Sequence, residues 1–472
     1  MELNLGKQIM KSRIGLYLLV FFFSVFFLTG CTSNEDKNIS NDLVQEGLEL
    51  YEERYYKDAM DKFVEALDIY PANFDAYVGL TDVLLDKGFF EDVENLAKEA
   101  SIRVSDEESA TIYSMIGGRY YDVEKYEEAG EMYEKAVDID RGYEKGRMGL
   151  AEVNIQLGNI GEARKALGSR GNSDEFLLLY AFLTLDDWSE GAKRIGDIEE
   201  SSLRERMEEI YEVDDEEVLY KSTLLAREYI NSGYPFLAIE LLNNQNEDMQ
   251  QYPDGQYFLG RAYLDYGNYE KAIEKLNNAL ILDLDEDDVY VSLARAYLFN
   301  NDIDNALNSY EAIISVESPD IVEEYVDVLM SNDMKNKAQT VLLNLLQEEN
   351  LFDLNIMLAD VYYELGEFNK MGEIVEALST ETDLSQSQTQ ELLRVKLLYN
   401  IENIENINEI DSLIDRYSVF DRYNPEIYFF RGKLYMHQDE NIEAVEAFER
   451  AIELDLKGEI TQEAEGLLAT IN

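Results

Sequence analysis

One stretch near the N-terminus decides the fold, and it reads GLELYEERYYKDAMDKFVEALDIYP over residues 47–71. Small and bulky residues stand in it at fixed offsets, namely Gly47, Ala59, Phe63, Ala66 and Pro71. A pattern that returns at a fixed period of 20 to 50 residues indicates a stacked array of small structural units. The skeleton returns with the same internal spacing at Gly117, Ala129, Tyr133 and Ala136, at Gly260, Ala272, Leu276 and Ala279, and at Gly432, Ala444, Phe448 and Ala451.

This skeleton resembles the tetratricopeptide repeat, a helix–turn–helix unit of about 34 residues. The resemblance implies a small residue at position 8, where the first helix packs closely on the second, and Ala at position 20 for the reciprocal reason. It also implies a bulky apolar residue at position 24, which fills the space between the helices. Ten repeats are placed with position 8 at Gly47, Thr81, Gly117, Ala151, Ala226, Gly260, Ala294, Val326, Ala359 and Gly432, and position 20 at Ala59, Val93, Ala129, Ala163, Ala238, Ala272, Ala306, Ala338, Met371 and Ala444.

Glycine and proline agree with these repeats. Glycine at position 15 suits the positive φ of a helix C-cap between the two helices of a repeat. It is found there at Gly88, Gly158, Gly233, Gly267 and Gly366. Four prolines, Pro71, Pro253, Pro319 and Pro425, fall between repeats, and Pro235 falls between two helices. No proline interrupts a predicted helix interior, where it would destabilise by about 3 kcal/mol.

The sequence therefore predicts an all-α, right-handed superhelical solenoid of about twelve tetratricopeptide repeats. Two stretches near residues 174–207 and 386–420 have the length of one repeat but lack the skeleton. We expect an N-terminal block over 40–168, a degenerate repeat acting as a hinge over 169–218, and a C-terminal block over 219–472. The last block should end in a capping helix near 460–471, because the final repeat would otherwise expose its stacking face.

Composition excludes several classes of chemistry. The 472 residues carry 99 Asp and Glu against 40 Lys and Arg, for a formal net charge of −59, with one His and one Cys. Nucleic acid is excluded as a partner because phosphate binding needs a basic surface. A Cys/His zinc site needs three or four such ligands, and a single Cys forms no internal disulfide. We expect no metal and no cofactor.

The first thirty residues have the pattern of a secretion signal. Basic residues at Lys7, Lys11 and Arg13 precede an apolar run over residues 14–28. A run of this length fits the core of a signal peptide and falls short of the roughly 20 residues of a membrane span. The sequence therefore predicts that residues 1–30 are a signal peptide.

The end of the apolar run, Leu28-Thr29-Gly30-Cys31, resembles the lipobox of bacterial lipoproteins. The resemblance implies cleavage before Cys31, a covalent diacylglycerol on its thiol, and a polar tether over residues 31–39. The protein would then be lipid-anchored on the extracytoplasmic side of a bacterial cell membrane. The alternative is a free Cys behind an ordinary signal or an anchor helix.

Three arginines form the sharpest candidate for a binding site. In the family that the chain resembles, positions 2, 5, 9 and 12 of the first helix line the concave groove. Position 9 is Arg227, Arg261 and Arg295 in three successive repeats, and Tyr257, Leu264 and Leu298 stand at neighbouring groove positions. Guanidinium groups on an apolar stripe suit carboxylates of an extended peptide or an anionic glycan. The alternative is that each Arg pairs with an acidic residue of a neighbouring helix and joins the repeats.

Two other motifs have ordinary structural explanations. His437 falls at a turn position of the last repeat, and without another His or Cys it builds no catalytic triad. The acidic run over residues 283–288 lacks the Gly and Glu of a calcium loop. We interpret it as a set of charges placed favourably at a helix N-terminus.

The function expected from these observations is that of a membrane-anchored, non-catalytic scaffold that binds protein or peptide, with basic partners favoured by its acidity. One alternative is an assembly factor of a secretion or envelope complex. Another is an acidic spacer that binds nothing in its groove. A repeat architecture hosts many functions, so the fold does not choose among them.

Overall fold

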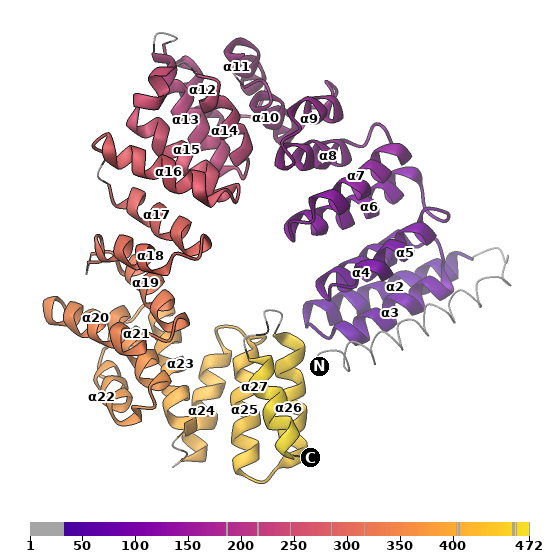
Figure 1. Ribbon diagram of the computed structural model, residues 1–472. Coiled ribbons are helices and arrows are strands. Elements are labelled where there is room, and N and C mark those ends of the chain that lie inside the picture. The colour runs from indigo at the N-terminus through magenta and orange to yellow at the C-terminus, as the bar shows by residue number, and fades with distance from the viewer. Residues whose placement is uncertain are drawn as a thin grey trace. The chain divides into compact units, whose positions relative to one another are not determined.

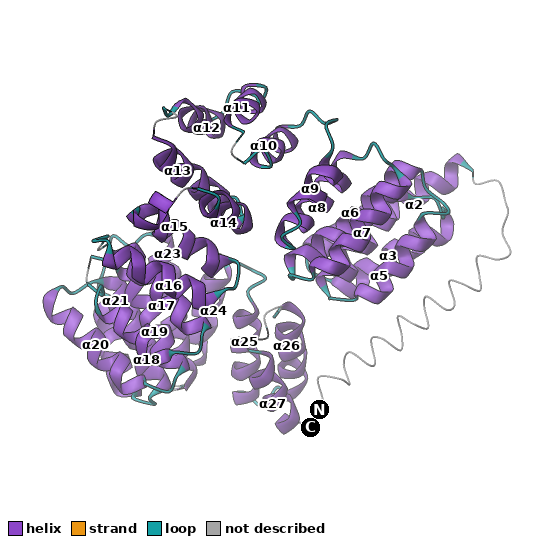
Figure 2. Ribbon diagram, turned by 45° about the horizontal axis from the view of Figure 1, so that its top comes forward, coloured by secondary structure: helices purple, strands orange, loops and turns teal. Residues whose placement is uncertain are grey.

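The computed structural model describes residues 33–471 apart from 186, 215–216, 246, 285, 316, 403, 405, 456–457 and 459. The described residues form 26 α-helices joined by turns, loops and short 3₁₀ segments, and they contain no strand (Figure 2). The prediction of an all-α fold is confirmed. Contacts between Cα atoms divide the chain into two compact units, the first ending at Met249 and the second running Gln250–Asn472.

The first unit contains the helices labelled α2 to α14 in Figure 1. Their bounds are α2 Asn34–Glu52, α3 Tyr56–Ile69, α4 Phe74–Asp86, α5 Phe90–Ala100, α6 Asp106–Asp122, α7 Tyr126–Ile139, α8 Glu144–Gln156, α9 Ile160–Leu167, α10 Asp174–Phe182, α11 Trp188–Gly196, α12 Ser202–Glu212, α13 Val218–Asn231 and α14 Pro235–Asn243. A 3₁₀ helix, Glu247–Gln251, follows at the boundary between the units.

The second unit contains α15 to α27. Their bounds are α15 Pro253–Asp265, α16 Tyr269–Ile281, α17 Asp287–Phe299, α18 Ile303–Glu311, α19 Pro319–Ser331, α20 Lys335–Glu348, α21 Phe352–Glu364, α22 Phe368–Leu378, α23 Gln386–Glu402, α24 Ile407–Ser418, α25 Pro425–His437, α26 Asn441–Leu454 and α27 Thr461–Ile471. Four of the helices in the two units begin with proline, at Pro235, Pro253, Pro319 and Pro425. The first helical position suits proline, because its missing N–H would have no partner there in any case.

Consecutive helices pair into twelve helix–turn–helix hairpins, from α2 with α3 to α25 with α26. The first helix of a hairpin also contacts the first helix of the next one, as α2 contacts α4, α4 contacts α6 and α6 contacts α8. The same contacts recur in the second unit between α15 and α17 and between α19 and α21. This is the arrangement of a helical solenoid, in which each repeat buries its faces against its neighbours. Two helices, α12 and α27, stand outside the hairpins.

The predicted packing inside a repeat is confirmed at position 8. A Cβ built on Gly47 would lie 2.7 Å from the ring of Phe63, the bulky residue at position 24 of the same repeat. A Cβ on Gly432 would lie 2.6 Å from Phe448 in the last repeat. Glycine is required at these places because the second helix brings its largest side chain against the backbone of the first. The residues at position 20, including Ala59 and Ala444, are fully buried.

The turn between the two helices is also as predicted. All five glycines at position 15 have positive φ, between 69° and 79°. The other five assigned repeats place a non-glycine residue in the same left-handed conformation. These are Arg54, Glu124, Asn301, Asp333 and Asp439, with φ between 57° and 62°. The backbone of this turn is therefore set by the helix pair and not by the residue that occupies it.

The loop over residues 168–173, at the start of the segment where the sequence predicts a hinge, lies within the first unit and is fastened to α8. The Arg147 guanidinium donates to the backbone carbonyl of Leu167 at 2.7 Å and also to that of Arg170. The Glu144 carboxylate accepts from the backbone N–H of Asn172 at 3.1 Å and of Ser173 at 3.4 Å. These bonds satisfy the carbonyl at the end of α9, a loop carbonyl, and two N–H groups just before α10, all of which lack helical partners. The degenerate segment that follows contains an additional helix, α12, beyond the hairpin α10–α11.

Candidate functional site

The predicted arginines all lie on first helices of hairpins, but they divide between the two units. Arg227 lies on α13 in the first unit, whereas Arg261 on α15 and Arg295 on α17 lie in the second. The side chains of all three are partly or largely exposed. Because α15 contacts α17, Arg261 and Arg295 stand on adjacent helices one repeat apart.

Arg295 joins two neighbouring repeats. Its Nε donates to Glu324 Oε1 at 2.8 Å and a terminal nitrogen donates to Oε2 at 2.9 Å, which links α17 to α19. The Tyr310 hydroxyl donates to the same carboxylate at 2.7 Å. The hydrogen bond from Arg295 is the main cause that lowers the pKa of Glu324. This contact matches the alternative interpretation, in which an arginine at position 9 pairs with an acid of a neighbouring helix and joins the repeats.

Arg261 has different surroundings. Its guanidinium lies 5.9 Å from the ring centroid of Tyr257, one turn earlier on α15. Among the described residues, no carboxylate lies within ion-pair distance of Arg261. Burial raises the pKa of Tyr257, while the positive charge of Arg261 opposes that rise. Burial also raises the pKa of Asp265, one turn later, against the influence of Arg261 and Arg295. Of the three arginines, Arg261 therefore has the guanidinium best placed for an external acceptor.

Arg227 forms an ion pair with a buried acid on its own helix. A terminal nitrogen of Arg227 lies 3.5 Å from a carboxylate oxygen of Glu228, whose side chain is only 6% exposed. Arg206 on α12 approaches the other oxygen of Glu228 at 3.6 Å. A buried carboxylate needs such partners because desolvation disfavours its charged form. Leu264 and Leu298, at groove positions of α15 and α17, are half-buried and stay candidates for contact with a ligand.

Carboxylates are close together on α19 and α21, the first helices of the two hairpins that follow α17 and α18. Burial raises the pKa values of Glu323 and Asp327 on α19, and repulsion from neighbouring acids raises them further. One of those acids, Asp360 on α21, is itself paired with Arg394 on α23 through two hydrogen bonds of 3.0 and 2.7 Å. On the first helices α17 to α23, Arg295 and Arg394 thus already have acidic partners, while Glu323 and Asp327 lie close to other acids.

The first unit carries a similar set of polar contacts between repeats. The Tyr51 hydroxyl on α2 donates to Asp86 on α4 at 2.6 Å, and Arg119 on α6 approaches the same carboxylate at 3.4 Å. Burial, followed by repulsion from Asp86, raises the pKa of Asp82 to about 6. Two repeats further along, between α6 and α8, the Gln156 amide donates to the Tyr121 hydroxyl at 2.8 Å. The sequence did not indicate these contacts, although both phenol pairs are separated by 35 residues.

No group of three or more His, Cys, Asp or Glu side chains in the described part of the chain is arranged to hold a metal ion. His437 is exposed and is the last helical residue of α25, directly before the turn where the sequence predicts it. Asp287 and Asp288 from the acidic run lie in the first turn of α17, as the interpretation of helix-terminal charges predicts. Asp283 precedes them in a turn with φ of 66°.

The proposed lipidation site, Cys31, and the lipobox residues Leu28, Thr29 and Gly30 lie outside the described residues. The signal peptide and the lipid anchor therefore stay predictions. Within the described residues, every helix is too short or too polar to span a membrane.

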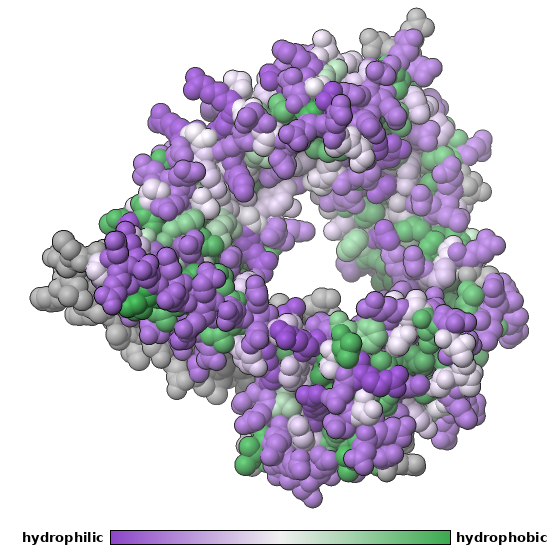
Figure 3. All heavy atoms as spheres, turned by 180° about the vertical axis from the view of Figure 1, so that it is seen from behind, coloured by the Kyte–Doolittle hydropathy of each residue, from purple (hydrophilic) through white to green (hydrophobic). Residues whose placement is uncertain are grey.

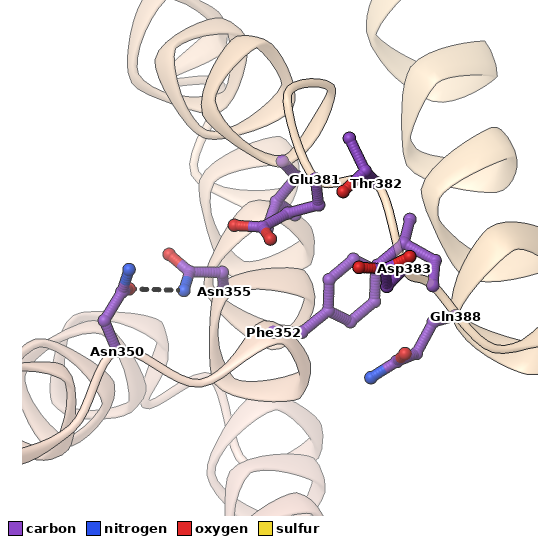
Figure 4. Close-up of a pocket in the computed structure, with 9 residues that line it drawn as sticks. Asn350, Phe352, Asn355, Glu381, Thr382, Asp383 and Gln388 are labelled. Carbon is purple, nitrogen blue, oxygen red and sulfur yellow. Dashed lines mark hydrogen bonds between the residues drawn. The ribbon is translucent and has the colours of Figure 1, made fainter.

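The surface of the described residues includes a hollow in each unit. The smaller, of about 280 Å³, lies between the loops that precede α21 and α23 and is lined mainly by polar side chains (Figure 4). Asn355 donates there to Asn350 at 2.8 Å, while Glu381, Thr382 and Asp383 come from one exposed loop. The larger hollow, of about 570 Å³, lies among α9, α10 and α11. The face in Figure 3 is mostly hydrophilic, with hydrophobic residues in scattered groups.

Comparisons with known proteins agree with the repeat pattern. Residues 120–175, 287–320 and 425–457 each match the tetratricopeptide repeat. No curated protein matched the chain.

Solved structures with a similar backbone include the Cut9–Hcn1 hetero-tetramer of the APC/C, at 12% identity over 92% of this chain and 96% of that chain, with a TM-score of 0.37. Naa15/Naa10 bound to HypK-THB is 13% identical over 92% and 96%, with a TM-score of 0.38. Yeast Tom70 is 14% identical over 92% and 95%, with a TM-score of 0.26. Three segments of the chain therefore match the tetratricopeptide repeat, and the helix hairpins give the described residues an all-α solenoid fold.

Proposed function

We propose that the protein is a non-catalytic scaffold that binds an extended, basic segment of another protein along the first helices of its second unit. The main support for this proposal is that the cations on that face are paired with acids, while several carboxylates there lie close to other carboxylates. Arg295 and Arg394 are already paired with acids, whereas Glu323 and Asp327 lie near further acids and have raised pKa values. A basic segment would relieve the repulsion among these carboxylates.

The charge of the whole chain acts in the same direction. A net charge of −59 produces a negative potential that raises the rate of encounter with basic partners. The Arg261 guanidinium, beside Tyr257, supplies donors for backbone carbonyls of the bound segment. Tetratricopeptide repeats generally serve as interaction scaffolds, which supports a binding role over a catalytic one.

A panel of labelled 15-residue peptides tests the proposal. Fluorescence anisotropy would compare a Lys-rich peptide in a Gly/Ser background with a Glu-rich and an uncharged peptide. We expect binding of the Lys-rich peptide alone, weakening as salt rises because exposed charges are screened. The double substitution of Glu323→Gln with Asp327→Asn should weaken binding severalfold. Glu348→Gln, an exposed acid at the end of α20, is the control. Equal binding of all three peptides, or none, would contradict the proposal.

We further propose that Cys31 anchors this scaffold to a membrane outside the cytoplasm, as the lipobox pattern suggests. A covalent acyl chain contributes roughly 0.8 kcal/mol of membrane binding per buried methylene, and two or more chains give stable attachment. Bacterial cells fed an alkyne fatty acid should label the protein and retain it in the membrane fraction. Cys31→Ala should abolish both, whereas Ser33→Ala should change neither. Label that persists in Cys31→Ala would refute the anchor.

A further inference from the structure

The larger hollow lies where the regular repeats give way to the degenerate one. Helix α9 has 8 residues and α10 and α11 have 9 each, whereas α8 has 13 and α13 has 14. The short helices leave a pocket of about 570 Å³ between them. Ligand pockets in proteins commonly measure roughly 300–1,000 Å³. The pocket is therefore large enough for at least one side chain of a partner.

The walls of the pocket are held in place before any ligand binds. One wall is the end of α9 with Gly168 and Ser169, in the loop that Arg147 fastens through the carbonyls of Leu167 and Arg170. The opposite wall is tied to α9 directly, because Arg164 Nε donates to the carbonyl of Leu183 at 2.7 Å. A wall fixed by such bonds lowers the ordering cost of binding.

The lining combines an apolar interior with opposite charges at the rim. Leu167 and Leu183 belong to the lining but are only 1% and 3% exposed, so the accessible apolar surface comes mainly from the half-buried Tyr180 ring, which has the Arg194 guanidinium 4.2 Å from its centroid. Asp187 is exposed, and one of its oxygens caps α11 by accepting from the backbone N–H of Glu190 at 3.2 Å. Its second oxygen is left for an external cation. Arg164 uses Nε within the protein, which leaves its terminal nitrogens for an external carbonyl.

We propose that this pocket is a docking subsite for an apolar side chain, of the size of Leu, that is followed by a basic residue in a partner segment. The apolar side chain packs against the accessible part of the Tyr180 ring, over the covered side chains of Leu167 and Leu183. The basic side chain pairs with Asp187, and Arg164 donates to a backbone carbonyl of the segment. This inference rests on the proposed function, since it assigns a specific subsite in the first unit to the same kind of partner.

A photoreactive peptide tests the subsite on the full chain. The probe is a 12-residue, acetylated and amidated Gly/Ser peptide that carries one photoreactive leucine analogue followed by two lysines. After irradiation, mass spectrometry should find the label within residues 164–190. A matched peptide with Ser in place of the leucine should bind tenfold or more weakly, as burial of a Leu-sized side chain implies.

Three substitutions sharpen the test. Ser169→Trp fills the pocket from its exposed wall and should abolish the label, whereas Ser189→Trp, an exposed site on α11 outside the lining, should not. Asp187→Asn keeps a good helix cap and removes the charge. It should therefore weaken binding of the lysine peptide severalfold, but should not weaken binding of a peptide with Ser in place of the two lysines. Thermal melting of each variant would show that the fold is intact.

The possible outcomes separate this inference from the proposed function. Label only on the first helices of the second unit, with Ser169→Trp without effect, would overturn the subsite while supporting the scaffold. Failure of every basic peptide to bind would overturn both. Label within 164–190 that Ser169→Trp removes would establish the subsite.

Discussion

Arg295 and Glu324 form a two-bond ion pair across successive repeats, with nitrogen–oxygen distances of 2.8 and 2.9 Å. The pair connects α17 to α19, and the Tyr310 hydroxyl completes it. Arg261, one repeat earlier, contacts the Tyr257 ring and forms no such pair among the described residues. Residues that are equivalent in the repeat therefore have different contacts: Arg295 joins two repeats, whereas Arg261 packs beside an aromatic ring.

This difference predicts unequal effects on stability. Arg295→Ala should lower the free energy of unfolding by about 1 kcal/mol, because it leaves the Glu324 carboxylate with Tyr310 alone while water still screens the site. Arg261→Ala should change it by less than about 0.5 kcal/mol. Urea unfolding monitored by circular dichroism measures both. A larger loss in Arg261→Ala than in Arg295→Ala would reverse the assigned roles.

The left-handed turn at position 15 predicts that replacing its glycine lowers stability, whereas introducing glycine there raises stability. Gly88 has φ of 70° and no atom near its would-be Cβ, so Gly88→Ala should destabilise by about 1 kcal/mol through backbone strain alone. Glu124→Gly, at the equivalent turn with φ of 59°, should stabilise by about 0.5 kcal/mol. Thermal melts would show the two signs. Gly161→Ala, in open space within α9, is the control and should stabilise slightly.

The close approach of α7 and α8 predicts that a single methyl group disrupts packing. A Cβ on Gly149 would overlap the ring of Tyr133, which packs against this glycine. Gly149→Ala should therefore lower the free energy of unfolding by about 1–3 kcal/mol, although helix propensity alone favours Ala. Gly118→Ala meets the same tyrosine only at 3.5 Å and is the matched control. A more stable Gly149→Ala protein would refute the packing argument.

The raised pKa of Asp82 predicts that the stability of the protein depends on pH. Its pKa is raised to about 6, so the folded state binds this proton more tightly than the unfolded chain does. Its contribution to stability is therefore greatest at low pH and is lost as pH rises from about 4 to about 6. Asp82→Asn should stabilise the protein at pH 7 by about 1 kcal/mol, after allowance for solvent screening.

The check for Asp82 is the difference in unfolding free energy between Asp82→Asn and the unsubstituted chain across pH 4 to 8. That difference should grow up to about pH 6 and then stay level. Glu49→Gln, an exposed carboxylate on α2, controls for the loss of one charge. A difference that does not change with pH would contradict the raised pKa of Asp82.

Much of the fold was predictable because its constraints act within one repeat. Small residues such as Gly47 and Ala59 are needed wherever Phe63 brings the helices together, so their spacing appears in the sequence. The contact of Phe63 with Gly79 in the next repeat was missed, since it depends on how hairpins stack. The extra helix α12 was missed for a related reason, as the repeat pattern has no place for it.

The candidate site was less predictable than the fold. Arg261 and Arg295 lie on successive first helices, as their spacing in the sequence indicates, but their partners depend on side-chain geometry. The hydrogen bonds that fasten loop 168–173 to Glu144 and Arg147 could not be predicted either. A loop rich in Gly and Ser is expected to be flexible when its partners are unknown. Side-chain contacts between elements distant in sequence leave little trace in a single sequence.

Crosslinking mass spectrometry on intact cells would show whether the protein is a scaffold for a basic partner. We predict crosslinks from the basic segments of one dominant partner to the first helices of residues 250–472. Crosslinks only between copies of this chain, or spread over second helices without a dominant partner, would contradict it and would favour an acidic spacer.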